Sequence, residues 1–197
     1  LRSWPVSELE EHGGWPALLT ALPDRQDLSA AQARAAMATI LNGDATPAQL
    51  IGFVVALRAK GETPEEISGL LDAVLAAATI VPLSDDLRER AVDIVGTGGV
   101  RSHSINVSTT AAIVVAGAGV PVCKHGARAA SSKCGAADVL EALGVALELP
   151  PEGVVRCVEE AGIGFCLAPV YHPAFRFAGP SRREIGIPTV FNLLGPI

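Results

Sequence analysis

The stretch from Asp93 to Leu143 constrains the fold more than any other part of this chain. Two short apolar runs each end in a loop rich in glycine or serine, and each loop leads into a helical pattern. The first loop is GTGG at 96–99, and the second follows KHG at 124–126. Strand, loop and helix in this order predict a parallel sheet with crossover helices. Because ligands bind beyond the carboxyl ends of such strands, we expect the two loops to lie side by side there.

The rest of the chain extends this α/β pattern and adds a helical N-terminal part. Residues 1–80 are expected to be helical, because Ser29, Thr46 and Thr63 each stand three residues before Gln or Glu, as in a capping box. The fold class is therefore α/β. We expect a small helical domain at 1–80 and a mainly parallel α/β domain at 81–197. Residues 169–186 of the second domain could pack with the helical domain. The expected strands are Asp93–Val95, Val120–Lys124 and Ile163–Ala168, with a further strand and turn at Pro188–Ile197, and the expected helices are Thr109–Ala118, Ala136–Leu143 and Glu152–Ala161. Three or four parallel strands make a small sheet with a bare edge, so the α/β domain is expected to be incomplete at its C-terminus.

Composition excludes several classes of partner. The net charge of −6 and the lack of a basic run argue against a nucleic-acid-binding surface. No signal peptide or membrane span is predicted, since the apolar run at 113–118 is short and contains glycine. The four cysteines form no CxxC pair, which favours free thiols in a reducing cytoplasm, although Cys123 and His125 leave a two-ligand metal site open as a weak alternative.

The two loops are interpreted as a cradle for a phosphorylated ligand. Backbone N–H groups at helix N-termini favour anions, and Lys124 among glycines and serines is a good phosphate partner. The loop at 96–99 matches neither the dinucleotide-binding fingerprint nor a P-loop, and glycine there could serve a simple turn. Arg182 could pair with a substrate carboxylate or belong to an ordinary charged helix face.

Several longer motifs carry a resemblance to a known family. They are NVST at 106–109, KHGAR at 124–128 followed by SS at 131–132, ADVLEALG at 137–144, and FNLLGP at 191–196. In this order they resemble the anthranilate phosphoribosyltransferase family, and the resemblance covers most of the chain from about Ala30 onward. This chain is then expected to be the N-terminal portion of such an enzyme.

The resemblance implies a two-domain homodimer that transfers the phosphoribosyl group of phosphoribosyl pyrophosphate to anthranilate or a related aromatic acid in tryptophan synthesis. It implies magnesium as cofactor, held by Ser108, and an acceptor site with His125, Ala127 and Arg182. No catalytic base is assigned. The residues implied to bind phosphoribosyl pyrophosphate are Gly96, Gly98, Gly99, Ser104, Asn106, Ser108, Thr109, Lys124, Ser131, Ser132 and Ala136.

Three departures from the family pattern keep alternatives open. Val100 replaces an acidic residue after the double glycine, Ala127 replaces an asparagine in the KHGNR motif, and the family's Asp-Glu metal pair falls beyond residue 197. The alternatives are a non-catalytic or nucleic-acid-binding relative on the same fold, and an enzyme similar to nucleoside phosphorylases. The KHG-x-R and NLLGP segments favour the transferase.

Overall fold

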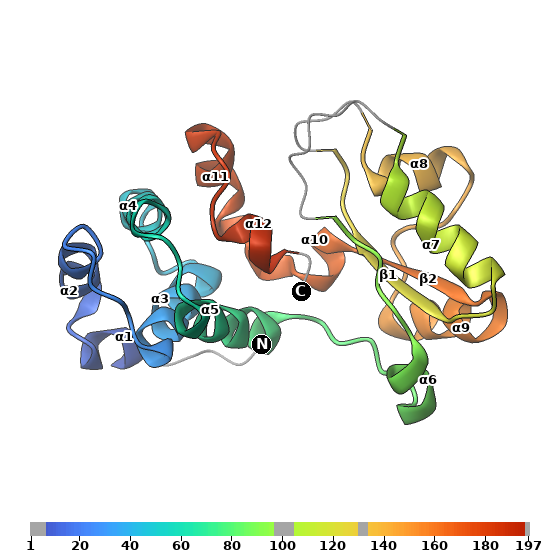
Figure 1. Cartoon of the computed structure of the whole chain (residues 1–197), viewed down its shortest axis with the longest axis horizontal. Helices are drawn as coiled ribbons and strands as arrows, with labels where there is room; N and C mark the ends of the chain where they lie inside the picture. Colours follow the sequence, from blue (N-terminus) through green and yellow to red (C-terminus); the bar gives the residue numbers. More distant parts are fainter. Residues whose placement is uncertain (1–6, 97–104, 130–133, 196–197) are drawn as a thin grey trace. The chain divides into compact units, whose positions relative to one another are not determined.

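The computed structural model describes residues 7–96, 105–129 and 134–195. Contacts between residues divide the chain into two compact units, and each is described by itself. The helical unit holds the chain up to residue 78 together with 172–195, and the α/β unit holds 79–171. Figure 1 labels the α-helices and strands of both units. The domain limits of 1–80 and 81–197 stay a prediction for the complete protein.

The helical unit contains a bundle of α-helices and a short 3-10 helix. Its elements are α1 (Ser7–Glu11), α2 (Gly14–Ala21), α3 (Ala30–Asn42), α4 (Pro47–Lys60), α5 (Pro64–Ala77), η1 (Pro173–Phe177), α11 (Gly179–Ile185) and α12 (Phe191–Leu194). Capping boxes at Ser29, Thr46 and Thr63 begin α3, α4 and α5, as the sequence predicts. The packed core includes Met37, Phe53 and, from the C-terminal segment, Phe191.

Gly69 permits the close packing of α3 and α5. A Cβ atom at Gly69 would lie 2.1 Å from the backbone oxygen of Ala30 at the start of α3, a distance that real Cβ atoms do not adopt. A side chain here would therefore force the two helices apart.

We expect Gly69→Ala to lower the free energy of unfolding by about 1–3 kcal/mol, because overpacking outweighs the better helix propensity of alanine. Urea denaturation measures the change. The matched control is Gly52→Ala in α4, where the added Cβ would lie 3.4 Å from Leu19 Cδ2, an ordinary contact. A Gly69→Ala protein as stable as the Gly52→Ala protein would contradict the packing argument.

The α/β unit is built on two parallel strands. Its elements are α6 (Asp85–Arg90), α7 (Val107–Gly117), β1 (Val122–Gly126), α8 (Ala136–Ala142), α9 (Pro151–Ala161), β2 (Ile163–Leu167) and α10 (Ala168–Tyr171). β1 pairs with β2 from Val122 opposite Ile163 to Gly126 opposite Leu167. The helices Thr109–Ala118, Ala136–Leu143 and Glu152–Ala161 and the strands Val120–Lys124 and Ile163–Ala168 are confirmed, with ends shifted by no more than two residues.

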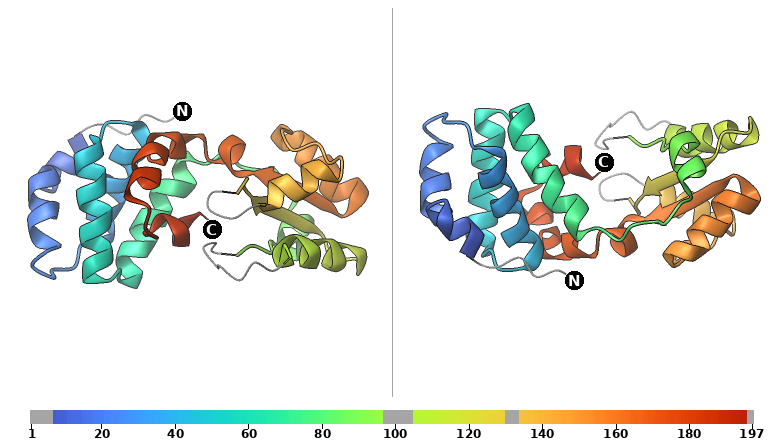
Figure 2. Two further views of the ribbon diagram at one scale, coloured as in Figure 1. Left: turned by 90° about the horizontal axis from the view of Figure 1, so that it is seen from above. Right: turned by 90° about the horizontal axis from the view of Figure 1, so that it is seen from below.

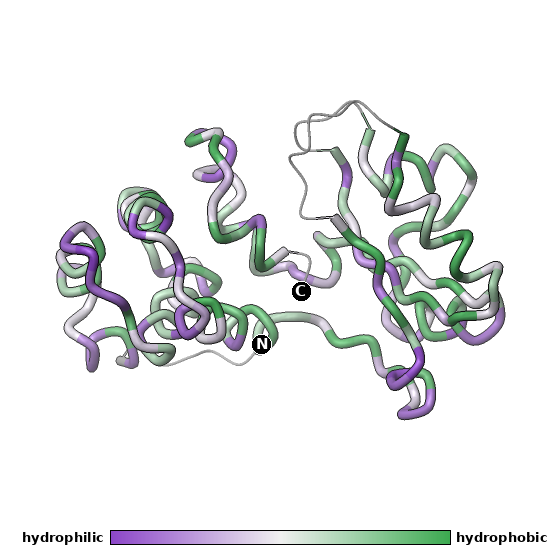
Figure 3. The backbone as a smooth tube through the Cα atoms, in the orientation of Figure 1, coloured by the Kyte–Doolittle hydropathy of each residue, from purple (hydrophilic) through white to green (hydrophobic). Residues whose placement is uncertain are grey.

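The helices α8 and α9 cover opposite faces of β2. Phe165 and Leu167 pack with α8, whereas Cys166 packs with Val154 and Val158 of α9. Successive strand side chains point to opposite faces, so the alternation along β2 determines which helix each side chain meets. Helix α7 also contacts both strands, and Figure 2 shows α7, α8 and α9 packed around them. Figure 3 shows hydrophobic colouring along much of α7.

The predictions of two strands, at Asp93–Val95 and at Pro188–Ile197, are wrong. Among the described residues near Asp93, only Val92 pairs, in an isolated parallel bridge with Val122. The backbone oxygen of Ile94 accepts a hydrogen bond from the side chain of Lys124, and no backbone amide of the described residues donates to it.

The second wrong strand is the one expected at Pro188–Ile197. Phe191–Leu194 form the helix α12, and the side chain of Asn192 accepts a hydrogen bond from the amide of Thr189. Phe191 and Leu194 stand three residues apart and are both buried in the helical unit. The apolar run is therefore one face of a helical turn, while residues 196–197 lie outside the described part.

Candidate functional site

The side chain of Lys124 is the most unusual group in the α/β unit. It lies in the middle of β1 and is only 1 % exposed. Its Nζ donates to the backbone oxygen of Ile94 at 2.6 Å and of His125 at 3.4 Å. Within the described residues, no carboxylate lies within ion-pair distance of this nitrogen. Burial lowers the pKa of Lys124, and the charge of Asp93 opposes this effect. A buried ammonium with only carbonyl partners is stabilised by an anionic ligand.

Asp93 and Ile94 lie directly beside the end of β1. The amide of His125 donates to Asp93 Oδ1 at 3.2 Å, and the amide of Cys123 donates to the backbone oxygen of Val92 at 3.1 Å. The segment 92–94, which leads into the first loop, is therefore held alongside β1. The expected juxtaposition of the two loops stays a prediction, because Gly96 is the only residue of GTGG among the described residues. Three residues that the sequence assigns to the first loop lie outside the described residues, namely Gly98, Gly99 and Ser104.

The N-terminus of α7 brings together three of the expected site residues. Asn106 is the N-cap, and its Oδ1 accepts from the amide of Thr109 at 3.2 Å and from Ser108 Oγ at 3.4 Å. The hydroxyl of Thr109 is buried without a hydrogen-bond partner among the described residues. A helix N-terminus favours negative charge, and an unpartnered buried hydroxyl is costly unless a ligand or water satisfies it. Asn106 thus acts first as a cap, a role that does not prevent ligand binding.

The second loop leads from β1 into α8. Ala136 is the first residue of α8, while Ser131 and Ser132 lie outside the described residues. Arg128 pairs with Glu141 and Asp138, so its guanidinium is engaged within the protein. The sequence interpretation included both acidic residues in the ADVLEALG motif but gave them no role. Asp138 stands three residues after Gly135, a helix-start spacing that could have revealed its contact.

The expected acceptor residues belong to different units. His125 is half-buried in β1 and Ala127 is exposed after it. Arg182 lies in α11 of the helical unit, with its Cζ atom 4.8 Å from the ring centroid of Phe191. Burial lowers the pKa of Arg182. No carboxylate of the described residues pairs with Arg182, which leaves its guanidinium able to bind an anion.

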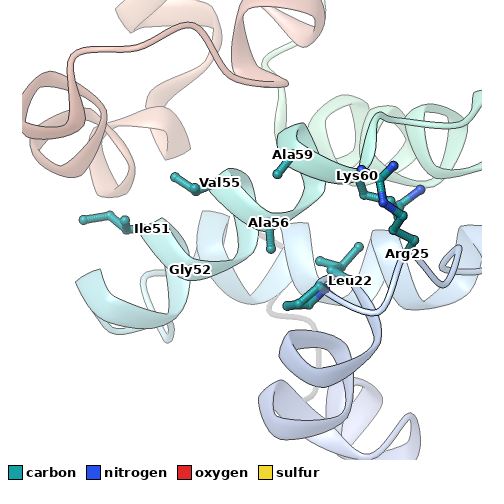
Figure 4. Close-up of a pocket in the computed structure, with 9 residues that line it drawn as sticks. Leu22, Arg25, Ile51, Gly52, Val55, Ala56, Ala59 and Lys60 are labelled. Atoms are coloured by element: carbon teal, nitrogen blue, oxygen red, sulfur yellow. The ribbon is translucent and has the colours of Figure 1, made fainter.

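The cavities of the two units differ in their chemistry. In the α/β unit, a cavity of about 160 Å³ is lined by Thr109 and Lys124 together with apolar side chains such as Phe165. In the helical unit, a cavity of about 410 Å³ lies against α4, as Figure 4 shows. Lys60 lines this second cavity and already pairs with Asp27 and Glu66. The ammonium of Lys60 therefore has carboxylate partners, whereas that of Lys124 has only backbone oxygens as partners among the described residues.

Other site classes find no support in the described part of the chain. No group of three or more histidine, cysteine, aspartate or glutamate residues there could hold a metal ion. The four cysteines are free thiols, with Cys123 Sγ and Cys166 Sγ 3.6 Å apart. None of the described helices combines the length and apolar content needed to cross a lipid bilayer.

Comparison with protein families identifies both halves of the chain. Residues 16–78 match a family described as glycosyl transferase family, helical bundle domain, and residues 88–197 match the glycosyl transferase family, a/b domain. The chain belongs to the glycosyl transferase family. The glycosyl transferase a/b match includes the C-terminal residues that pack in the helical unit, so sequence family and contact-based unit differ for 172–195.

Two similar proteins are both named anthranilate phosphoribosyltransferase. The chain is 65% identical over 185 residues to an anthranilate phosphoribosyltransferase of Saccharopolyspora erythraea, covering 94% of this chain and 52% of that protein. It is 60% identical over 183 residues to the one from Salinispora arenicola, covering 93% of this chain and 52% of that protein. The glycosyl transferase chain spans about half the length of the curated relatives it matches.

Solved structures agree with the fold. The anthranilate phosphoribosyltransferase of Thermus thermophilus matches with a TM-score of 0.84 at 45% identity, covering 91% of this chain and 54% of that one. The enzyme from Saccharomyces cerevisiae in complex with PRPP and Mg matches with a TM-score of 0.83 at 31% identity, covering 96% of this chain and 55% of that one. These matches confirm a helical domain followed by an α/β domain with a parallel sheet.

Proposed function

We propose that the protein transfers the phosphoribosyl group of phosphoribosyl pyrophosphate to the amino nitrogen of anthranilate or a related aromatic acid, as a step of tryptophan biosynthesis. The observation that carries this proposal is the buried Lys124 ammonium, which lacks a carboxylate partner in the described structure, together with the buried hydroxyl of Thr109, which has no hydrogen-bond partner among the described residues. Both groups suit a phosphorylated substrate. The names of the similar proteins support the same reaction.

The described residues act by binding and orientation. Loss of pyrophosphate builds positive charge on the ribose and negative charge on the leaving group. Lys124 and the amides at the start of α7 would stabilise the leaving charge, and Arg182 would hold the carboxylate of the acceptor. An aromatic amine is nucleophilic without a strong base, which agrees with the lack of an assigned general base.

Magnesium fits the oxygen atoms at the start of α7. Among the described residues, Ser108 Oγ makes one long hydrogen bond of 3.4 Å, to Asn106 Oδ1. Hydroxyl and phosphate oxygens are hard ligands that magnesium prefers. Ser108 would supply one protein oxygen, while the phosphates of the substrate supply others. When bound, magnesium neutralises charge on the pyrophosphate.

We further propose that the protein works as a cytoplasmic homodimer without nucleic-acid or membrane partners. The acidic net charge of −6 supports the lack of a nucleic-acid partner.

A direct assay tests the proposed function. The full-length protein is incubated with phosphoribosyl pyrophosphate, magnesium and anthranilate, and the release of pyrophosphate and the phosphoribosylated product are measured. We expect both products in equal amounts. Pyrophosphate release with no aromatic acceptor modified, or turnover of a nucleoside with phosphate instead, would overturn the proposal.

Ala127 allows a prediction about the acceptor. Its methyl group cannot form the hydrogen bonds that an asparagine offers at this exposed position. We expect anthranilate to be a poor acceptor and Ala127→Asn to raise kcat/KM for anthranilate about fivefold, since one hydrogen bond contributes about 1 kcal/mol. Steady-state kinetics on the full-length protein measures the change.

The matched control is Ala127→Leu, which adds volume without hydrogen-bonding groups. We expect Ala127→Leu to give no gain. If the natural protein already uses anthranilate well and Ala127→Asn leaves the rate unchanged or lower, the idea of an altered acceptor is wrong.

A further inference from the structure

The carboxylate of Asp138 holds both ends of the second loop. Its Oδ2 atom accepts from the amide of Ala129 at 2.9 Å and from the amide of Gly135 at 2.7 Å. These residues lie on either side of the segment 130–134. One side chain in the first turn of α8 therefore fixes the distance between the two ends.

Gly135 shows how closely these ends approach each other. A Cβ atom there would lie 2.5 Å from Ala129 N, 2.7 Å from Arg128 C and 2.8 Å from Ala127 O. The amide of Ala137 also donates to the backbone oxygen of Ala127 at 3.2 Å. The backbone after β1 therefore packs directly against the start of α8.

The chemistry of Asp138 suits an internal support rather than a ligand contact. The amides of Ala129 and Gly135 hold the pKa of Asp138 below its ordinary value, with a smaller contribution from Arg128. The side chain is thus ionised at neutral pH. A carboxylate repels phosphate, whereas it makes strong charge-assisted hydrogen bonds to backbone amides. Glu141 also contacts Arg128, at 2.7 Å for both of its oxygens, but no backbone contact from it to the loop is present among the described residues.

We propose that Asp138 is a positioning residue for the binding of phosphoribosyl pyrophosphate: it holds Ala129 and Gly135, the described residues on either side of 130–134. The proposal rests on the proposed function. Asp138 acts through the amides of Ala129 and Gly135 and does not itself touch the substrate.

Three variants of the full-length protein test this role by calorimetry with phosphoribosyl pyrophosphate and magnesium. Asp138→Ala removes both contacts and is expected to raise Kd at least about tenfold. Asp138→Asn keeps an oxygen that can accept from both amides, so it should restore most of the affinity. Glu141→Ala removes the same charge from the same helix and should change Kd less than about threefold. Equal Kd values for Asp138→Ala and Glu141→Ala would overturn the proposal.

Kinetics separate positioning from a general structural role. For Asp138→Ala we expect KM for phosphoribosyl pyrophosphate to rise while kcat at saturation changes little. If kcat falls for Asp138→Ala while KM for phosphoribosyl pyrophosphate stays unchanged, the proposal is overturned. Failure of the proposed function is recognised separately, because the natural protein itself would then show no binding.

Amide hydrogen exchange tests the contacts without any variant. In the natural protein, the amides of Ala129 and Gly135 should exchange slowly. Exchange of both at the rate of unprotected amides would overturn the proposal, even if Asp138→Ala fails to fold.

Discussion

Replacement of Lys124 by alanine is expected to weaken the binding of phosphoribosyl pyrophosphate about 100-fold and to leave binding of the aromatic acceptor nearly unchanged. The ammonium is buried and has only backbone oxygens as partners in the described structure. A contact to phosphate would therefore be strong, because water does not screen it. Calorimetry on the full-length protein measures both affinities.

A second variant controls for the cavity that alanine leaves. Lys124→Met keeps an apolar chain of similar length, so it should preserve the fold and still lose affinity for phosphoribosyl pyrophosphate. Replacing a buried charge by an apolar group often leaves stability unchanged or higher. Equal affinities in the natural protein and in both variants would show that Lys124 does not contact the phosphates.

Replacement of Glu66 by alanine is expected to have the largest effect on stability, a loss of about 3–5 kcal/mol in the free energy of unfolding. Glu66 is fully buried and accepts hydrogen bonds from the amides of Leu28 at 2.9 Å and Thr63 at 2.8 Å. It also pairs with Lys60 at 3.0 Å. Alanine would leave two amides without this partner and would leave Lys60 with Asp27 as its remaining carboxylate in the described structure.

Urea denaturation measures this loss, and Glu65 provides the matched control. Glu65 is the neighbouring residue in α5, is exposed, and accepts one long hydrogen bond of 3.4 Å, from the amide of Ala30, within the described part of the chain. We expect Glu65→Ala to cost less than about 1 kcal/mol. Similar losses for Glu65→Ala and Glu66→Ala would contradict the role assigned to the buried carboxylate.

Local patterns in the sequence predicted much of the secondary structure. The capping boxes at Ser29, Thr46 and Thr63 involve residues three positions apart, so the sequence shows both partners together. The order of strand, glycine loop and helix likewise predicted β1, α8, α9 and β2 within two residues. These signals depend on neighbouring residues, and the tertiary structure does not need to supply a partner.

The prediction of function depended on longer motifs and on a resemblance to a known family. Lys124 was selected because it lies among glycines and serines, and the structure places it in a buried position beside Ile94. The ligand assignments for Gly98, Gly99, Ser104, Ser131 and Ser132 stay predictions, because these residues lie outside the described part.

Contacts between distant residues were decided only by the tertiary structure. Glu66 meets Leu28 across 38 residues, and Asp93 meets the amide of His125 across 32. The pattern at Pro188–Ile197 is equally apolar as a strand or a helical turn, and burial of Phe191 and Leu194 in the helical unit selects the helix. A short apolar run can satisfy its backbone in either form, so the surface against which it packs determines the outcome.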